Sequence, residues 1–426
     1  MQPCSTLVLV VNFYLAIIKS RIIIKNFPYK IVGLIIALAA LLIGYFTNRV
    51  FYSVGILFAA VFVVTTKNWY KEIRRDRFLA SFLLLPFIVL VADLSSNGIE
   101  VISQSTFFTK LTLFLLPLFI TVWKPKAKET MRVHFALYLL LMVNLLYSFF
   151  HFFLDQEQVM EGYKFAKVMK VMSLNDHIRI SWLSAIAVIL AIRDSTLTTS
   201  KTIKYLLFAF ILIQVIYLHV LSAKTGLLCL YSSLLIYSIY LSYKSSIKKG
   251  IITLITLITL PIAAYFLVPS FERRIGYVRW DFSEFLSGAE RAGLSDGNRF
   301  HSIHAGVSIF KENPMGIGFV NIQDTTNQWL MINKKFLSTT DYILPSSEFL
   351  IYAVGGGIIG LFLLVLHFAM PFTYKEIWKD SLFPSIYLPA LVTFMYEIHF
   401  EGQLSLFVYA FFVFWVYYLA KSRLIN

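Results

Sequence analysis

The sequence predicts an all-α, polytopic membrane protein with about 12 transmembrane helices and one large polar loop between the ninth and tenth spans. Of its 426 residues, 58% are hydrophobic and only 14% are charged, whereas soluble domains carry roughly 25% charged residues. The apolar residues fall in continuous runs of about 17–25, the length that a helix needs to cross the hydrocarbon core. A closed β-barrel would instead show short segments of alternating polarity.

Twelve apolar runs are predicted to be spans, with boundaries good to several residues. They cover residues 31–47, 51–66, 79–95, 107–123, 133–153, 178–192, 203–221, 226–243, 251–268, 347–370, 382–400 and 403–420.

Lysine and arginine concentrate in alternate connections between these spans. They gather in the segments 19–30, 67–77, 124–132, 193–204, 244–249, 374–379 and 421–423, whereas the short loops 48–49, 96–106, 222–225 and 401–402 carry few of them. The positive-inside rule therefore places both termini in the cytoplasm and the long loops 154–177 and 269–345 outside, which in a double-membrane bacterium means the periplasm. The same loops account for the net charge of +15, so no nucleic-acid partner is predicted.

We divide the chain into N-terminal membrane helices (1–268), a periplasmic loop or helical insertion (269–345) and C-terminal membrane helices (346–426), forming one membrane domain overall. The insertion holds eight Lys/Arg and eight Asp/Glu residues. Long polar loops on rigid scaffolds often carry function, so we expect the chemistry there. Near its start, Arg273, Arg274 and Arg279 alternate with aromatic residues, which predicts an amphipathic helix at the bilayer surface or, alternatively, one that contacts substrate.

Several kinds of chemistry have no motif in this sequence. It contains no Walker motif, dinucleotide fingerprint, zincin His pair or Asp-x-Asp pair, and its two cysteines, Cys4 and Cys229, lie far apart. No cofactor and no metal site are therefore predicted. Any reaction would use a preactivated substrate, with Arg or Lys holding an anion and one general base.

Three cations at predicted outer ends of spans are candidates for an anion clamp. Lys224 lies in a tight turn between two spans, and Arg299 lies in the long loop close to His301 and His304, which are candidate bases. Arg179 begins another span, where it either binds substrate or reaches toward the interface as a structural anchor. A cation at a membrane edge is expected to be paired or functional.

Two carboxylates end the penultimate predicted span. Glu397 and Glu401 are four residues apart, so on a helix they would share one face, and Gln403 follows them. We expect these carboxylates to pair with a neighbouring cation such as Arg299 or Lys224. The glycine run at 355–360 predicts close packing between helices.

These stretches, in this order, resemble the O-antigen ligase and O-antigen polymerase superfamily, in a variant typical of Bacteroidetes. The resemblance covers most of the second half of the chain. It rests on Asp-His-Ile-Arg-Ile-Ser at 176–181, Ser-Ala-Lys-Thr-Gly at 222–226, Asn-Arg at 298–299, Glu-Asn-Pro-Met-Gly-Ile-Gly at 312–318, Ser-Ser-Glu-Phe-Leu at 346–350 before Gly-Ile-Ile-Gly at 357–360, and Glu-Ile-His-Phe-Glu-Gly-Gln at 397–403.

The resemblance implies a GT-C-like, metal-independent glycosyltransferase of the bacterial inner membrane that acts in lipopolysaccharide biosynthesis. Its donor would be a glycan linked to undecaprenyl diphosphate. Ligases pass that glycan to lipid A-core sugar, and polymerases pass it to another repeat unit. Lys224 and Arg299 stand at the positions of two functional arginines of the family, where both would stabilise charge on the departing diphosphate.

One departure from the family concerns the acceptor-activating base. Ser346 stands where ligases carry a histidine, and a serine hydroxyl is a poor base. Either His301, His304, Glu348 or Asp341 replaces it, or the chemistry has diverged. The remaining residues of the predicted site would bind substrate: Arg179, Glu348, Glu397, Glu401 and Gln403.

Two other functions fit the same composition. A transporter of lipid-linked sugars would carry ionisable residues near mid-span and paired broken helices, and the sequence has almost no mid-span charge. A relative that binds lipid-linked glycan without catalysis is the other alternative, and it fits the missing histidine.

Overall fold

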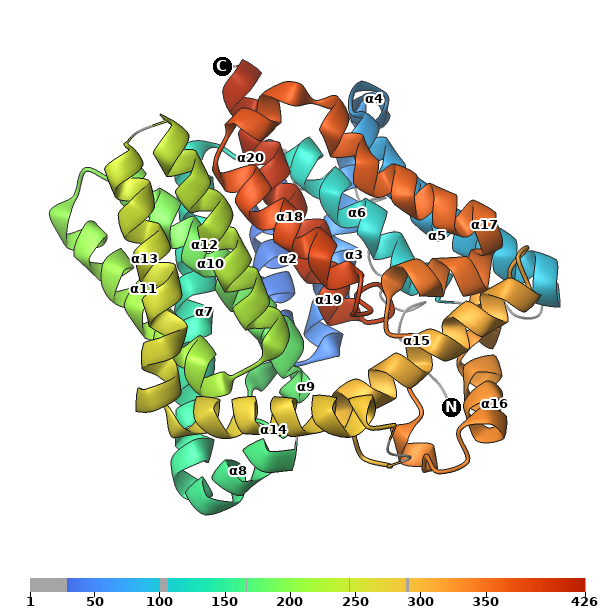
Figure 1. Cartoon of the computed structure of the whole chain (residues 1–426). Helices are drawn as coiled ribbons and strands as arrows, with labels where there is room; N and C mark the ends of the chain where they lie inside the picture. Colours follow the sequence, from blue (N-terminus) through green and yellow to red (C-terminus); the bar gives the residue numbers. More distant parts are fainter. Residues whose placement is uncertain (1–28, 100–105, 166, 245, 289–290, 426) are drawn as a thin grey trace.

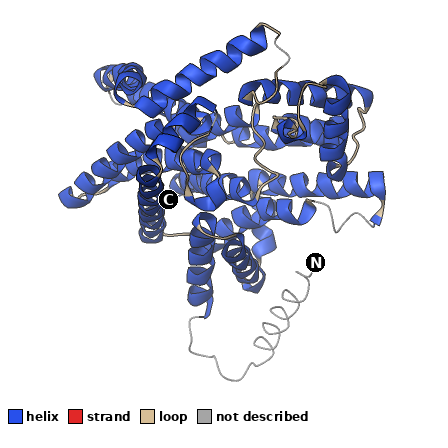
Figure 2. Cartoon of the chain, turned by 90° about the horizontal axis from the view of Figure 1, so that it is seen from below, coloured by secondary structure: helices blue, strands red, loops and turns tan. Residues whose placement is uncertain are grey.

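The computed structural model describes residues 29–99, 106–165, 167–244, 246–288 and 291–425. Every regular element in these ranges is helical (Figure 2). Most of the predicted cytoplasmic segment 19–30 lies outside the described residues.

The helices of the first two thirds of the chain follow one another through short connections. They are α2 (Tyr29–Phe46), α3 (Arg49–Thr65), α4 (Trp69–Arg75), α5 (Arg77–Asn97), α6 (Phe107–Trp123), α7 (Ala127–Leu154), α8 (Gln156–Gly162), α9 (Met172–Asn175), α10 (His177–Leu197), α11 (Lys201–Leu221), α12 (Lys224–Lys244) and α13 (Ile247–Leu267).

The last third adds a group of helices at one end of the bundle and then returns to long apolar helices. These are α14 (Pro269–Leu286), α15 (Ser295–Glu312), α16 (Ile322–Asn333), α17 (Glu348–Ala369), α18 (Leu382–Phe394), α19 (Gln403–Phe407) and α20 (Phe414–Ile425), with a π-helical turn, Val408–Val413, joining the last two.

Eight helical stretches among the described residues are long and apolar enough to cross a membrane, or nine if the bent α3–α4 pair is one span. Three shorter apolar helices, Lys30–Phe46, Phe107–Trp123 and Leu382–Phe394, coincide with the remaining predicted spans. The chain is therefore an all-helical protein with the composition of a polytopic membrane protein, and the total of twelve spans stays a prediction.

The most buried helices are α10 and the C-terminal α19–α20 pair, whose apolar stretches are 78% and 89% buried. At the periphery, α13 is only 11% buried (Figure 1). Its isoleucines Ile255, Ile258 and Ile262 are each more than half exposed. Such an outward apolar face is suited to lipid.

Ion pairs join the connections at the end of the bundle that holds the C-terminus. Lys421 pairs with Asp76 at 2.7 Å, and Arg423 pairs with Asp380 at 2.7 Å. Lys124 pairs with Glu72 at 2.8 Å. These ion pairs join connections that were all predicted to be cytoplasmic. The structure therefore places those connections at the same end of the bundle. We call this the C-terminal end; its side of the membrane stays a prediction.

The opposite end carries α14, α15 and α16 and is called here the α14 end (Figure 1). The amphipathic helix predicted near Arg273 is confirmed as α14, which lies across the ends of α11 and α13. A small separate core of Ala305, Leu330 and Leu337 holds the segment around α15 and α16 together.

Helix α17 is broken at Gly357, whose backbone has φ +65° and ψ −159°. The segment Pro314–Gly318 inserts at this break. Ile317 and Gly318 N–H groups donate to the Val354 and Gly355 carbonyls at 3.0 Å, and Ile358 N–H donates to the Pro314 carbonyl at 2.9 Å. A Cβ on Gly357 would lie 2.4 Å from the Met315 carbonyl carbon. The predicted close packing at this glycine run is therefore against an inserted loop as well as against helices.

Candidate functional site

Four helices begin close together at the α14 end, and their first turns carry most of the predicted site. These helices are α10, α12, α15 and α17, which begin at His177, Lys224, Ser295 and Glu348. Helix α10 packs against α12 and α15 packs against α17, and the ion pair between Lys224 of α12 and Asp296 of α15 links the two pairs of helices. The N-terminus of a helix carries partial positive charge and favours anions. Carboxylates of the protein already take this role at two of the four, Asp176 at α10 and Asp281 at α15.

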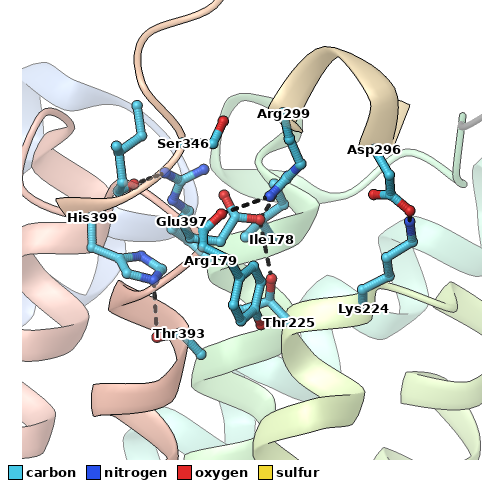
Figure 3. Close-up of polar contacts among 12 residues, drawn as sticks. Ile178, Arg179, Lys224, Thr225, Asp296, Arg299, Ser346, Thr393, Glu397 and His399 are labelled. Atoms are coloured by element: carbon cyan, nitrogen blue, oxygen red, sulfur yellow. Dashed lines mark hydrogen bonds and ion pairs between the residues drawn. The ribbon is translucent and has the colours of Figure 1, made fainter. Parts of the chain in front are cut away.

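Arg299 on α15 forms an ion pair with Glu397, with Nη2 2.7 Å from Oε1, and its Nη1 donates to the Tyr396 carbonyl at 3.1 Å (Figure 3). Thr225 Oγ1 donates to the same Glu397 oxygen at 3.4 Å. The pair between Arg299 and Glu397 agrees with the pairing predicted from sequence. Glu397 is almost buried, whereas about a quarter of the Arg299 side chain is exposed.

Lys224 forms a second ion pair with Asp296. Lys224 precedes Thr225 in α12, and Asp296 lies one helical turn before Arg299 in α15, so the two ion pairs are neighbours (Figure 3). Both partners are partly exposed. The two cations that the resemblance singled out are thus side by side, each neutralised by a carboxylate of the protein itself.

Arg179 also reaches this place. Its Nη2 donates to the Ile398 carbonyl at 2.6 Å, and its Nη1 lies 3.5 Å from Asp176, which caps α10 by accepting from the Arg179 N–H. Tyr396, Glu397 and Ile398 therefore supply the groups that hold two arginines.

The connection 395–402 between α18 and α19 is the common partner of these groups. Glu348 accepts hydrogen bonds from the His399 and Phe400 N–H groups at 2.7 and 3.0 Å through one carboxylate oxygen. The connection is a series of turns, so the expectation that Glu397 and Glu401 share a helix face is wrong. They point to different cations because the three residues between them have non-helical backbone.

Glu401 pairs with Lys110 at 2.5 Å, and the Lys110 ammonium is fully buried. It also lies over two aromatic rings, 4.5 Å from the centre of Phe319 and 5.2 Å from that of Tyr352. Sequence reasoning missed Lys110 because it was counted within an apolar span. The sequence feature that could have revealed Lys110 is a lone lysine in the first turn of an apolar span, at the same end as the other cations.

Ser346 lies before α17 and is buried. Its Oγ accepts from Ser302 Oγ at 3.0 Å, and its N–H donates to the same oxygen at 3.1 Å. Ser302 lies in turn 2.8 Å from the Arg299 carbonyl. Ser346 therefore contacts a hydroxyl rather than a group that can take its proton.

His301 and His304 lie on the other face of α15, roughly 200° and 140° around the helix from Arg299. His301 packs against Phe285 and Phe336, with ring centres 6.0 and 5.4 Å away, and His304 packs against Trp329 at 5.2 Å. Burial, followed by Lys334 and His304, lowers the pKa of His301. The structure does not bring these histidines to the ion pairs.

Two further candidates, Asp341 and Gln403, lie among groups of the protein that indicate a structural role. Asp341 accepts from Gly293 N–H at 3.1 Å, Asn298 Nδ2 at 2.9 Å and Ser338 Oγ at 2.6 Å. Burial raises the pKa of Asp341, but these hydrogen bonds outweigh it and hold the pKa below its ordinary value. Gln403 begins α19, and its Oε1 is buried without a hydrogen-bond partner among the described residues.

His399 is a histidine that the structure brings close to Arg179 and Arg299, and the sequence analysis did not select it. Its ring is fully buried, with Nε2 3.0 Å from Thr393 Oγ1 and the ring centre 4.5 Å from that of Trp182. Burial, then Arg179 and Arg299, holds the pKa of His399 well below its ordinary value.

A pocket of about 450 Å³ lies at the same end, beside the Asp176 cap of α10. Its lining combines apolar and aromatic side chains with three uncharged polar residues and one lysine: Phe46, Thr47, Tyr147, Lys170, Val171, Met172, Ser173, Leu174 and Asn175. Three consecutive lining residues, Ser173, Leu174 and Asn175, have φ between +57° and +66°. Such left-handed backbone costs energy outside glycine and marks a segment held in place by its surroundings.

No model of a known protein family matches the chain, and a search of curated proteins found no match either.

Proposed function

We propose that this protein is a metal-independent glycan transferase of the bacterial inner membrane, with about twelve spans, a GT-C-like fold and both termini in the cytoplasm. It would transfer an undecaprenyl-diphosphate-linked oligosaccharide or polysaccharide to an acceptor sugar at the periplasmic face, as an O-antigen ligase acting on lipid A-core. The proposal rests on one observation above all: Lys224 and Arg299 form adjacent ion pairs among converging helix N-termini.

Those groups suit a diphosphate leaving group. In the proposed reaction an acceptor hydroxyl oxygen bonds to the anomeric carbon, the bond from that carbon to the diphosphate oxygen breaks, and the diphosphate leaves with the electron pair. Guanidinium and ammonium groups stabilise the negative charge that develops on the leaving oxygens. The pocket beside Asp176 has a mixed lining, in which the apolar side chains Phe46, Val171 and Leu174 could contact the lipid part of such a donor.

The acceptor proton needs a base, and the surroundings of the candidates favour Glu397. His301 and His304 face away from the ion pairs, and Glu348 is fully buried and bonded to backbone N–H groups. Glu397 forms an ion pair with Arg299. If a diphosphate binds Arg299 and displaces Glu397, the freed Glu397 carboxylate stays beside the reacting atoms. We propose that this carboxylate accepts the hydroxyl proton.

The test is glycan transfer by the purified full-length protein in detergent, using a polyprenyl-diphosphate-linked oligosaccharide and lipid A-core. Arg299→Ala and Lys224→Ala should each reduce the rate at least about 100-fold, as the loss of a group that stabilises transition-state charge does. Arg273→Ala is the matched control, because Arg273 is a partly exposed cation at the same end that pairs with Glu161. Full activity of both site variants would contradict the proposal.

Deletion of the gene separates ligase from polymerase. If the protein is a ligase, lipopolysaccharide loses its capped material and polymer accumulates on undecaprenyl diphosphate. Capping by single repeat units in the deletion strain would instead identify a polymerase, the first alternative.

A lipid-linked glycan transporter or binding protein without transferase activity is the second alternative. The break in α17 at Gly357 favours it, because transporters place discontinuous helices at their binding sites. Transbilayer movement of a fluorescent polyprenyl-diphosphate sugar in proteoliposomes, without any transfer to acceptor, would identify that function.

A further inference from the structure

The unusual residue at the α14 end is Arg274, which no part of the proposed reaction uses. Its side chain is only 7% exposed, and its Nε and Nη1 atoms are buried with no hydrogen-bond partner among the described residues. Within the same residues no carboxylate comes within ion-pair distance of it. The guanidinium lies over the ring of Tyr277, with the guanidinium carbon 5.3 Å from the ring centre.

An unpaired buried charge is costly, because it loses its hydration without gaining a partner. A ring beneath a guanidinium recovers only part of that cost. Burial lowers the pKa of the Arg274 guanidinium, and the neighbouring Tyr277 and Asp296 counter that shift. An arginine buried in this way is explained if a ligand supplies the missing anion.

The position of Arg274 follows from the helix that carries it. On the buried face of α14, Ser270 Oγ donates to the Val220 carbonyl at the end of α11, at 2.9 Å. At the other end of the same face, Asp281 accepts from the Asp296 and Gly297 N–H groups at the start of α15, at 2.9 and 3.3 Å. Arg274 lies between these two contacts.

Arg274 therefore lies close to the turn that joins α11 to α12 and carries Lys224. The two cations interact electrostatically with each other, and both interact with Asp296 and Asp281. Asp296 is thus the counter-ion of Lys224 and the nearby anion of Arg274. Asp281 already caps the N-terminus of α15, so the groups left to meet a ligand are the two cations and the partly exposed Asp296. Two neighbouring cations of this kind fit a phosphoryl group that displaces Asp296.

We propose that Arg274 and Lys224 form a phosphoryl-binding subsite next to the Arg299–Glu397 pair, and that Asp296 occupies this subsite when no ligand is bound. Its ligand is one phosphoryl group of a membrane-borne phosphate or diphosphate. Identifying that group with the diphosphate of the glycan donor rests on the proposed function; the existence of the subsite does not.

Binding to the full-length protein in detergent tests the subsite. The probes are inorganic diphosphate, farnesyl diphosphate, farnesyl monophosphate and phosphatidylglycerol. Arg274→Gln should weaken the binding of farnesyl diphosphate at least about tenfold, in line with the loss of a charge-assisted contact. Arg273→Gln removes the same charge from the adjacent, outward position and should change the affinity less than about twofold. Equal losses in both variants would overturn the proposal, because they would indicate only a general attraction to basic protein.

The probes separate two sources of the phosphoryl group. Dependence on Arg274 for farnesyl diphosphate but not for phosphatidylglycerol identifies a diphosphate carrier. Dependence for phosphatidylglycerol as well identifies a general phospholipid headgroup, which supports the subsite but not its assignment to the donor. Binding of every probe without dependence on Arg274 overturns the subsite.

Two further variants distinguish a ligand-binding role from a structural one. Arg274→Met should raise the melting temperature of the ligand-free protein, since it removes an unpaired buried charge, and should abolish the stabilisation that farnesyl diphosphate gives. Asp296→Asn should increase the affinity for farnesyl diphosphate, because it removes the competing carboxylate. A lower melting temperature in Arg274→Met with unchanged binding would show that Arg274 is structural.

The proposed function and the subsite can fail separately. If Arg299→Ala abolishes glycan transfer while Arg274→Gln binds farnesyl diphosphate normally, the subsite is wrong and the transferase stands. If no transfer occurs but diphosphate binding depends on Arg274, the subsite stands and the transferase assignment is wrong.

Discussion

Lys110 shows how a single buried charge is accommodated in an apolar helix. It meets Glu401 at 2.5 Å, and the rings of Phe319 and Tyr352 lie around it. Its ion pair with Glu401 holds one end of the connection 395–402 in place. Glu348 holds the middle of that connection by accepting hydrogen bonds from two of its backbone N–H groups. That connection in turn holds Arg179 and Arg299, so Lys110 and Glu348 act on the site as positioning residues.

We predict that Lys110→Met alone destabilises the protein by about 3–5 kcal/mol, since it leaves a largely buried carboxylate without its partner. The double variant Lys110→Met, Glu401→Gln should recover most of that loss. Thermal or denaturant unfolding of all four members of the cycle in detergent measures the coupling. Additive losses in the double variant would contradict a direct interaction.

At the scale of elements, the break in α17 depends on glycine. Gly357 has φ +65° and ψ −159°, a conformation that is essentially restricted to glycine, and it touches the backbone of the inserted segment. The break directs the short first part of α17, with Glu348 at its start, toward the 395–402 connection.

Gly357→Ala should therefore destabilise the protein by at least about 1–3 kcal/mol, through backbone strain and through the clash with Met315. Gly33→Ala in α2 is the matched control, because a Cβ there meets nothing within 4 Å. That change should be neutral or stabilising by up to about 1 kcal/mol. Similar melting temperatures for the two variants would show that α17 tolerates a regular helix at this point.

The packing of α15 against α14 and α16 should depend on pH through His301. Its pKa is lowered in the folded protein by burial, Lys334 and His304, so the unfolded chain binds the proton more readily. Stability is then fully present above the unfolded pKa of about 6.5 and falls as the pH drops below it. His301→Phe should reduce the loss of melting temperature between pH 7 and pH 5. An unchanged loss in that variant would contradict a role of His301.

At the scale of the whole molecule, the two ends of the bundle differ in the loops they collect. Met315 is 75% exposed at the α14 end, and Lys71 is exposed near the C-terminal end. In a background without Cys4 and Cys229, Met315→Cys should react with a membrane-impermeant maleimide from the periplasm. Lys71→Cys should react only after the membrane is permeabilised. The reverse labelling pattern would invert the predicted orientation.

Much of the architecture could be predicted from the sequence, because a long apolar run in a membrane must satisfy its backbone hydrogen bonds internally and therefore forms a helix. Each of the twelve predicted runs contains a helix of the structure, and the expected pairing of Glu397 with Arg299 is present. Other features depend on contacts between distant segments. Pro314–Gly318 breaks α17 through hydrogen bonds to residues some 40 positions away. No local pattern distinguishes the inward Arg274 from the outward Arg273.

Asp296 and Glu397, which pair with Lys224 and Arg299, would affect which lipids the proposed site can bind. A bilayer presents a very large excess of ordinary headgroups with a single phosphate, and an open pair of cations would be saturated by them. If the site binds a diphosphate as proposed, the incoming anion must first displace Asp296 from Lys224 or Glu397 from Arg299. One phosphate replaces one carboxylate with little net gain in charge interaction, whereas two linked phosphates displace both at the entropic cost of a single binding event. The ion pairs of the ligand-free protein would thus lower its affinity for ordinary phospholipids more than its affinity for a lipid diphosphate.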